Sequence, residues 1–102
     1  MITCHVRYEV DPDQIEAFEA YARLWLEIVP RLGGTHHGYF LPSEGASDVA
    51  FCTFSFPTFA AYEQYRAAAA TDAKAQEAAA LAARTKCFRR YDRSFFRPLL
   101  TA

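Results

Sequence analysis

The sequence predicts an α+β domain of the ferredoxin-like type, in which the order strand, helix, strand, strand, helices, strand forms one antiparallel sheet with helices on one face. Three observations lead to this fold class. Apolar side chains alternate along the first segment, they recur at spacings of three and four along the second, and turn-forming residues separate two further strand-like segments. The chain has 102 residues, which fits one domain spanning 1–102.

The first predicted strand, residues 2–10, has two chemically different faces. Its apolar face includes Val6 and Tyr8, and its other face carries His5, Arg7 and Glu9. If the apolar face packs on the helices, the second face lies on the opposite side of the sheet. We expect a second copy of the chain to cover that side and to enclose a cavity there.

A long helix is predicted to follow, from Asp11 to about Leu32. Asp11 and Pro12 suit an N-cap and a first turn, whereas Pro30 and Gly33 suit a helix end. The residues that recur on one stripe and should face the sheet are Ile15, Phe18, Ala22, Trp25, Val29 and Leu32.

Two adjacent histidines lie in the second predicted strand, residues 34–42. Because side chains alternate along a strand, His36 and His37 should point to opposite faces. Strict alternation places Tyr39 on the face of His37 and Phe40 on the face of His36. The more polar pair is therefore His37 with Tyr39.

The remaining elements are a third strand, two helices and a last strand. The third strand, residues 49–56, is apolar on both faces, which favours an interior position. Thr71 and Asp72 interrupt the helical pattern after it, so we predict one helix before them and another over 73–84. The last strand spans 87–96.

The last strand and its extension are rich in arginine. These side chains could clamp an acidic ligand, but ion pairs with Glu9, Asp92 or a partner subunit explain them equally well. They are Arg89, Arg90, Arg93 and Arg97. The apolar tail, residues 99–102, is expected to dock on another surface.

Composition limits the partners. The net charge of -1 provides no field for nucleic acid or anionic lipid, and no apolar run is long enough to span a membrane. We therefore expect a soluble, cytoplasmic protein. The 16% aromatic content is high for a small domain and favours a homodimer. The three cysteines lack the spacing of a zinc site or a disulfide framework and should be buried.

Several segments together carry a resemblance to a known family. VRYEVDPD, FEAYARLW, GGTHHGYFLPSEGA, FSFPTFAAYEQYR and YDRSFFRP resemble the NIPSNAP family of the dimeric α/β-barrel superfamily, over nearly the whole chain. The resemblance implies a homodimer of ferredoxin-like domains that pair as an α/β barrel. It also implies wider relatives such as EthD-like proteins and cofactor-free antibiotic-biosynthesis monooxygenases. It supplies no catalytic motif.

The candidate functional residues are three histidines and two neighbours. His5 or His37 is the candidate catalytic base, because an imidazole moves protons near neutral pH. Arg7, His36 and Tyr39 are the candidate substrate-binding residues, with Arg7 holding an anion. A structural role also remains open. In it Arg7 and Glu9 pair at the dimer contact and His5 is a satisfied interface residue, while the histidines next to the turn bond to the backbone.

The sequence offers no sign of a metal or an organic cofactor. Adjacent histidines diverge on a strand, so only one of them could join His5 at an ion. No dinucleotide, P-loop or nucleophile-elbow motif occurs. Two functions remain: a homodimer that binds a small organic molecule, as a cofactor-free isomerase or oxygenase, and a non-catalytic interaction or stress-associated module.

Overall fold

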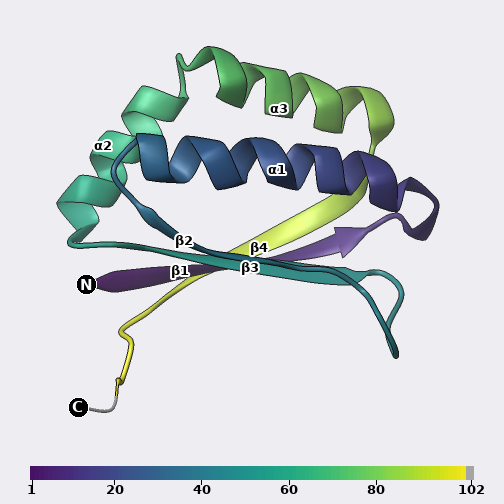
Figure 1. Cartoon of the computed structure of the whole chain (residues 1–102), viewed down its shortest axis with the longest axis horizontal. Helices are drawn as coiled ribbons and strands as arrows, with labels where there is room; N and C mark the ends of the chain where they lie inside the picture. Colours follow the sequence, from purple (N-terminus) through teal and green to yellow (C-terminus); the bar gives the residue numbers. More distant parts are fainter. Residues whose placement is uncertain (101–102) are drawn as a thin grey trace.

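The computed structural model describes residues 1–100 and confirms the ferredoxin-like fold. Four antiparallel strands form one sheet in the order β2-β3-β1-β4, and three helices cover one of its faces (Figure 1). None of the described helices has the length and apolarity needed to cross a membrane. The elements are β1 (Ile2–Val10), a 3-10 turn (Pro12–Gln14), α1 (Ile15–Arg31), β2 (Thr35–Phe40), β3 (Val49–Phe56), α2 (Phe59–Ala69), α3 (Ala73–Thr85) and β4 (Phe88–Phe96).

The two-faced character predicted for β1 is confirmed. The side chains of Val6 and Tyr8 are buried beneath the helices, whereas Arg7 is exposed on the other face. β1 pairs with β3 on one side and β4 on the other, so it occupies the interior of the sheet together with β3. This register puts the alternate residues of three strands on the same helix-covered face.

The boundaries of α1 follow the cap signals. The Asp11 carboxylate accepts a hydrogen bond from the Asp13 N–H at 2.9 Å, which opens the 3-10 turn before the helix. Pro30 lies in the last turn, Leu32 is the C-cap, and Gly33 has a φ of +101°, which favours glycine.

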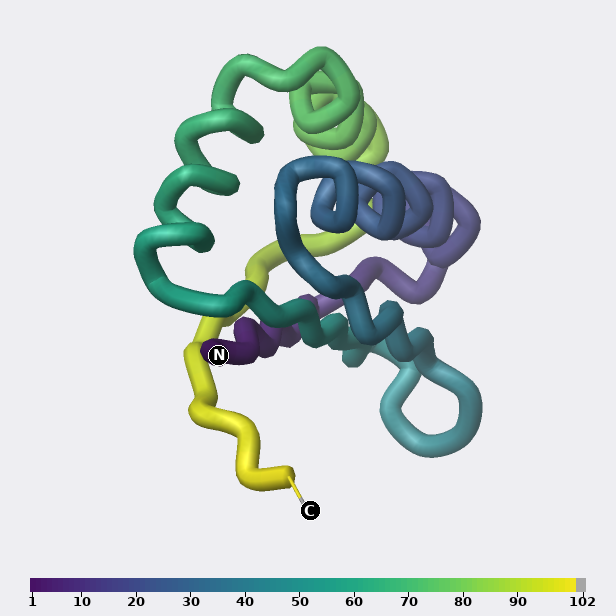
Figure 2. The backbone as a smooth tube through the Cα atoms, turned by 60° about the vertical axis from the view of Figure 1, so that its left-hand side comes forward, coloured from purple at the N-terminus to yellow at the C-terminus, as the bar shows by residue number. Residues whose placement is uncertain are grey.

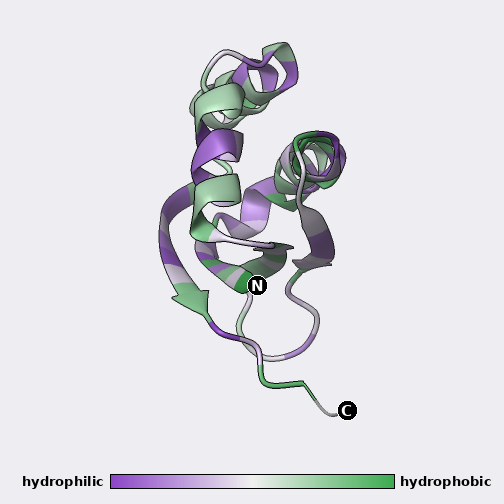
Figure 3. Cartoon of the chain, turned by 90° about the vertical axis from the view of Figure 1, so that its left-hand side faces the viewer, coloured by the Kyte–Doolittle hydropathy of each residue, from purple (hydrophilic) through white to green (hydrophobic). Residues whose placement is uncertain are grey.

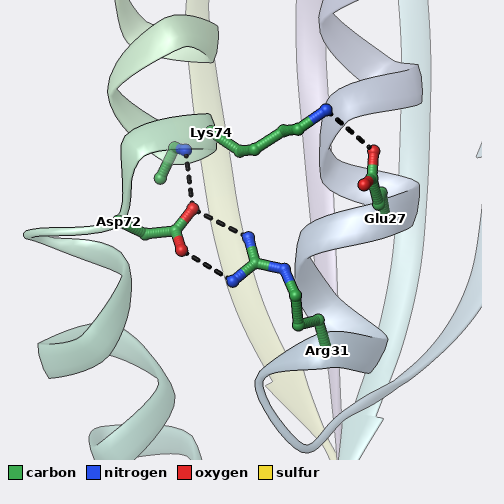
Figure 4. Close-up of polar contacts among 5 residues, drawn as sticks. Glu27, Arg31, Asp72 and Lys74 are labelled. Atoms are coloured by element: carbon green, nitrogen blue, oxygen red, sulfur yellow. Dashed lines mark hydrogen bonds and ion pairs between the residues drawn. The ribbon is translucent and has the colours of Figure 1, made fainter.

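The break between α2 and α3 also lies where Thr71 and Asp72 predict it. The Asp72 carboxylate caps α3 by accepting from the Ala75 N–H at 3.0 Å. The same carboxylate accepts two hydrogen bonds from Arg31 of α1, at 2.7 and 2.9 Å (Figure 4). Lys74 and Glu27 make a second contact between the two helices at 3.3 Å. These contacts hold the α2–α3 turn against the C-terminal end of α1.

A bulge in β2 overturns the predicted pairing of His37 with Tyr39. The register with β3 shifts between His36 and Gly38, so His37 is an extra residue without an opposite partner. Gly38 has a φ of +113°, which an L side chain rarely adopts. After this shift His36 and Tyr39 share the helix-covered face, where their rings stack 5.2 Å apart.

The core lies between the sheet and the helices. Its fully buried side chains include Phe18 and Ile28 of α1 and Phe56 of β3. All three cysteines are buried there without a disulfide, as expected. Burial raises the pKa of Cys4 to about 11 and that of Cys52 to about 12, so both stay thiols at neutral pH.

The other face of the sheet carries no helix, and we call it the open face. Figures 2 and 3 show all the helices on one side of the strands, while the chain after β4 runs away from them. Phe40, Phe51 and Phe96 remain 49%, 36% and 55% exposed on the open face. In the tail, Leu99 and Leu100 are exposed, and 101–102 lie outside the described residues, so the docking of the tail stays a prediction.

Candidate functional site

A pocket of about 190 Å³ lies between the sheet and the helices, inside one chain. We call it the aromatic pocket. Apolar cavities of roughly 150 Å³ accept a molecule the size of benzene, so this pocket admits a small ring compound. The residues that line it are Val6, Tyr8, Tyr21, Trp25, Val29, His36, Tyr39, Phe54, Tyr65, Arg66, Ala69, Tyr91 and Arg93.

Five polar-tipped aromatic rings follow one another along the pocket. The centroid distances are 6.4 Å from Trp25 to Tyr21, 6.2 Å from Tyr21 to Tyr8, 6.2 Å from Tyr8 to Tyr39, and 5.2 Å from Tyr39 to His36. Each ring combines a flat apolar surface with one hydrogen-bonding group. The pocket therefore suits a flat ligand with few polar atoms.

His36 enters the pocket as a neutral hydrogen-bond donor. Its Nδ1 accepts a hydrogen bond from the Gly38 N–H at 2.9 Å, so in the neutral ring the proton is on Nε2. Nε2 is buried and has no partner among the described residues. Burial, and secondly the neighbouring charge of His37, lowers the pKa of His36 to about 4, which keeps the ring neutral at pH 7.

Trp25 supplies a second N–H group of the same kind. Its indole Nε1 is buried and unpaired within residues 1–100. The indole lies near the Tyr21 hydroxyl and lowers the pKa of Tyr21 against a larger rise from burial, but its N–H does not reach hydrogen-bond geometry with any described acceptor. An unpaired buried donor costs about 1–3 kcal/mol, which a ligand oxygen would recover.

Three tyrosines of the pocket keep their protons at neutral pH. Burial raises the pKa of Tyr21 to about 12 and raises the pKa values of Tyr8 and Tyr39 well above the usual range. Together with the neutral His36, they supply hydrogen-bond donors and no strong base.

Two arginines line the pocket from α2 and β4. Arg66 donates to the Tyr62 hydroxyl at 2.9 Å, and the Arg93 guanidinium lies 5.5 Å from the centre of the Tyr91 ring. Neither has a carboxylate within 4.0 Å in the described part of the chain, and no described lining residue is acidic. The pocket is therefore electropositive.

The predicted site residues are divided between the two faces of the sheet. His36 and Tyr39 lie together in the aromatic pocket, whereas His5, Arg7 and His37 lie on the open face. The roles predicted for these five residues stay predictions.

The open face groups its histidines with other side chains. The His5 ring lies 5.2 Å from that of Phe51 and 6.2 Å from that of Phe96. His37 Nε2 is 2.7 Å from Ser55 Oγ, which in turn is 2.7 Å from Thr3 Oγ1. These contacts give each histidine a structural partner.

The other arginines of the last strand pair on the surface. Arg89 contacts Glu9 at 3.2 Å and Arg90 contacts Asp92 at 3.1 Å. Across residues 1–100, no three histidine, cysteine or acidic side chains gather closely enough to hold a metal ion.

Most of the pocket residues were not singled out from the sequence. The pattern predicts Trp25 on the apolar stripe of the helix and Tyr8 on the apolar face of the first strand. Both side chains lie on these inward faces in the structure. The signal that could have marked them is that these inward positions carry Trp and Tyr, whose N–H and O–H groups need partners, rather than Leu or Ile. Nothing in the sequence around Arg66 indicates that its side chain lines a pocket.

Comparisons with known proteins identify the family. A NIPSNAP protein of unknown function from Agrobacterium tumefaciens has 16% identity and a TM-score of 0.81, with 96% of this chain and 87% of that chain covered. An uncharacterised NIPSNAP-like domain protein from Burkholderia xenovorans has 16% identity and a TM-score of 0.79, covering 99% and 87%. A Nitrosomonas europaea protein, provisionally assigned as an antibiotic biosynthesis monooxygenase, has 16% identity and a TM-score of 0.76, covering 98% and 100%.

At these identities the structures show a shared fold. No curated protein matches the chain. The sequence profile of the NIPSNAP family matches residues 5–102, which is nearly the whole chain. This protein therefore belongs to the NIPSNAP family.

Proposed function

We propose that this protein binds a small, flat organic molecule in the aromatic pocket and acts on it without a cofactor, as an isomerase or oxygenase. The observation that carries the proposal is the pocket itself. One chain forms it, flat rings form much of its wall, and two of its lining residues carry a buried N–H group without a partner among the described residues. Ligand sites of soluble proteins typically combine an apolar wall with a few polar groups in this way.

The chemistry of the lining favours reactions that pass through an anion. Donors such as the His36 and Trp25 N–H groups stabilise negative charge that develops on a ligand oxygen. Isomerisation and oxygenation of an acidic ring compound both proceed through such an anion, which the compound forms by losing its proton to water before it binds. The provisional monooxygenase assignment of the Nitrosomonas europaea protein supports including oxygen consumption among the assays.

We propose further that the open face joins two copies of the chain. Its exposed rings of Phe40, Phe51 and Phe96 resemble an interface more than a solvated surface. The face also carries both basic and acidic side chains, which can pair across a contact between two copies. They are Arg7, Arg90, Glu9 and Asp92. His5, Arg7 and His37 then lie at the contact between subunits.

The test of ligand binding uses a variant that fills the pocket. Ala69 of α2 lines the pocket, and its neighbour Ala68 is exposed. In a thermal-shift screen of small aromatic compounds, we expect hits to stabilise wild type and the Ala68→Phe variant but not Ala69→Phe. Hits that stabilise all three proteins equally would move the site elsewhere.

A second candidate function is a non-catalytic interaction module, which the exposed rings of the open face favour. It predicts that replacing His5 or Arg7 by alanine changes the oligomeric state while turnover and ligand affinity stay absent. Turnover in the wild type that Ala69→Phe abolishes and Ala68→Phe retains would exclude this second function.

A further inference from the structure

The aromatic pocket presents an unusual set of polar groups. Its described lining contains two arginines, a neutral histidine, an indole and five tyrosines, and no acidic side chain. Two of the N–H groups, on Trp25 and His36, are buried without a partner. We infer that the natural ligand is an aromatic carboxylate, whose carboxylate oxygens accept from these N–H groups in the field of Arg66 and Arg93. This inference rests on the proposed binding function and names its ligand class.

The donors explain why an acceptor is needed. The Gly38 N–H occupies Nδ1 of His36, so only the Nε2–H group is left without a partner among the described residues, and an indole nitrogen can only donate. A group with lone pairs and no proton can accept from both donors, whereas the proton of a hydroxyl or an amine would need a further acceptor in the pocket. Among common acceptors, an ionised carboxylate accepts the most hydrogen bonds.

The arginines explain why the acceptor is negatively charged. They approach the pocket from different elements, Arg66 from α2 and Arg93 from β4, and both influence the pKa values of Cys4 and Tyr65. They therefore act on the same region. Neither is neutralised by a carboxylate of residues 1–100 within 4.0 Å. In a partly enclosed site two unpaired cations favour an anion over its neutral analogue.

The size and shape of the lining explain the aromatic part. Rings of tryptophan, tyrosine and histidine, with centroids 5.2 to 6.4 Å apart, form much of the wall, and each ring has flat apolar faces. A one-ring or two-ring acid can pack on these faces while its carboxylate reaches the donors. The volume of about 190 Å³ excludes larger ring systems from complete burial.

The experiment compares two acids with their amides. The probes are benzoate and 2-naphthoate, with benzamide and 2-naphthamide as uncharged analogues of the same shape, titrated into the full chain and followed by calorimetry. We expect the better acid to bind at least about tenfold more tightly than its amide. An amide that binds as tightly as its acid would overturn the inference.

Matched variants locate the charge and the donors. Arg93→Gln should weaken acid binding about tenfold and leave amide binding nearly unchanged, whereas Arg90→Gln, on the open face of the same strand, should change neither. Trp25→Phe keeps a ring and removes the N–H, and should weaken acid binding about tenfold. Equal effects of Arg93→Gln and Arg90→Gln, or no effect of Trp25→Phe, would contradict the inference.

Failure of the inference and failure of the proposed function give different results. If acids and amides bind equally and Ala69→Phe abolishes both, the pocket is a binding site and only the carboxylate assignment is wrong. If none of the four probes binds the wild type, neither proposal holds for ring compounds of this size.

Discussion

At the scale of single residues, His36 shows how burial determines the role of an imidazole. Its pKa is lowered to about 4, first by burial and then by the charge of His37, from an ordinary value of 6.5. The folded state therefore binds fewer protons than the unfolded state between these two pH values. The stabilising contribution of neutral His36 is complete above about pH 6.5 and is lost as the pH falls toward 4.

This shift gives the first prediction. Between pH 7 and pH 5 the wild type should lose more unfolding free energy than His36→Phe, by on the order of 1 kcal/mol, because the ring is only partly buried and solvent screens its charge. Urea denaturation of both proteins at the two pH values measures the difference. Parallel losses would mean that His36 titrates normally in the folded protein.

Gly34 gives a second prediction at the same scale. A Cβ atom there would lie 2.7 Å from the Phe56 ring and 2.8 Å from Val29 Cγ1. Both neighbours are buried, so neither can move aside freely. Gly34→Ala should lower the free energy of unfolding by about 1–3 kcal/mol, measured by urea denaturation. An unchanged value would mean that the core around Phe56 has spare room.

The sequence predicts the positions of some pocket residues but not of others. Trp25 and Tyr8 could be placed on the correct face because periodicity fixes which side of a helix or strand points inward. Arg66 could not be assigned to the pocket, because its position depends on how α2 crosses the sheet. The distance and angle between a helix and the sheet are set by tertiary packing rather than by local sequence.

At the scale of elements, the bulge in β2 decides which histidine enters the pocket. Strict alternation predicts that His37 shares a face with Tyr39. Because His37 is the extra residue of the bulge, His36 shares that face instead. Gly38 was the available signal, since an isolated glycine in a strand often marks a bulge. A one-residue shift of this kind reverses every face assignment on one side of it.

The bulge gives a third prediction. Gly38 has a φ of +113° and open space around its Cα, so an added methyl group strains the backbone without a steric clash. Gly38→Ala should destabilise the protein by about 1–3 kcal/mol and should weaken ligand binding by displacing His36. Full stability with normal binding would indicate that the bulge tolerates an ordinary residue.

The junction of α1, α2 and α3 gives a fourth prediction. Hydrogen bonds from Arg31, and secondly from the Ala75 N–H, lower the pKa of Asp72 to about 2 from 3.8. Asp72→Ala should lower the melting temperature more than Glu27→Ala, because it removes both the cap and the contact between helices. Its effect should be complete above about pH 3.8 and should diminish as the pH falls toward 2. Equal effects of the two substitutions would show that the cap contributes little.

At the scale of the whole molecule, the fold was predictable because the strand and helix patterns are strong and appear in the correct order. The position of the cavity was not predictable in the same way. The two faces of β1 predict a cavity on the side of His5 and Arg7, whereas the aromatic pocket lies on the helix side. Apolar alternation identifies the inward face of a sheet but gives no sign of where packing leaves a space.

The open face gives a fifth prediction, which concerns assembly. Phe51 lies in its centre, stacked on Phe40 at 4.9 Å and near His5. Phe51→Arg should convert the proposed dimer to a monomer at micromolar concentration, because two buried like charges would face each other. Light scattering coupled to size exclusion measures the mass of both proteins. A wild type that is already monomeric would contradict the dimer.

The central claim is that the ligand of this protein binds between the sheet and the helices rather than on the open face. The most direct measurement is a map of NMR chemical-shift changes in the ¹⁵N-labelled protein during titration with 2-naphthoate. We predict that the largest changes occur at the Trp25 indole N–H and at the backbone amides of His36 and Tyr39. Changes concentrated instead at His5, His37 and Phe51 would contradict the claim and place the site on the open face.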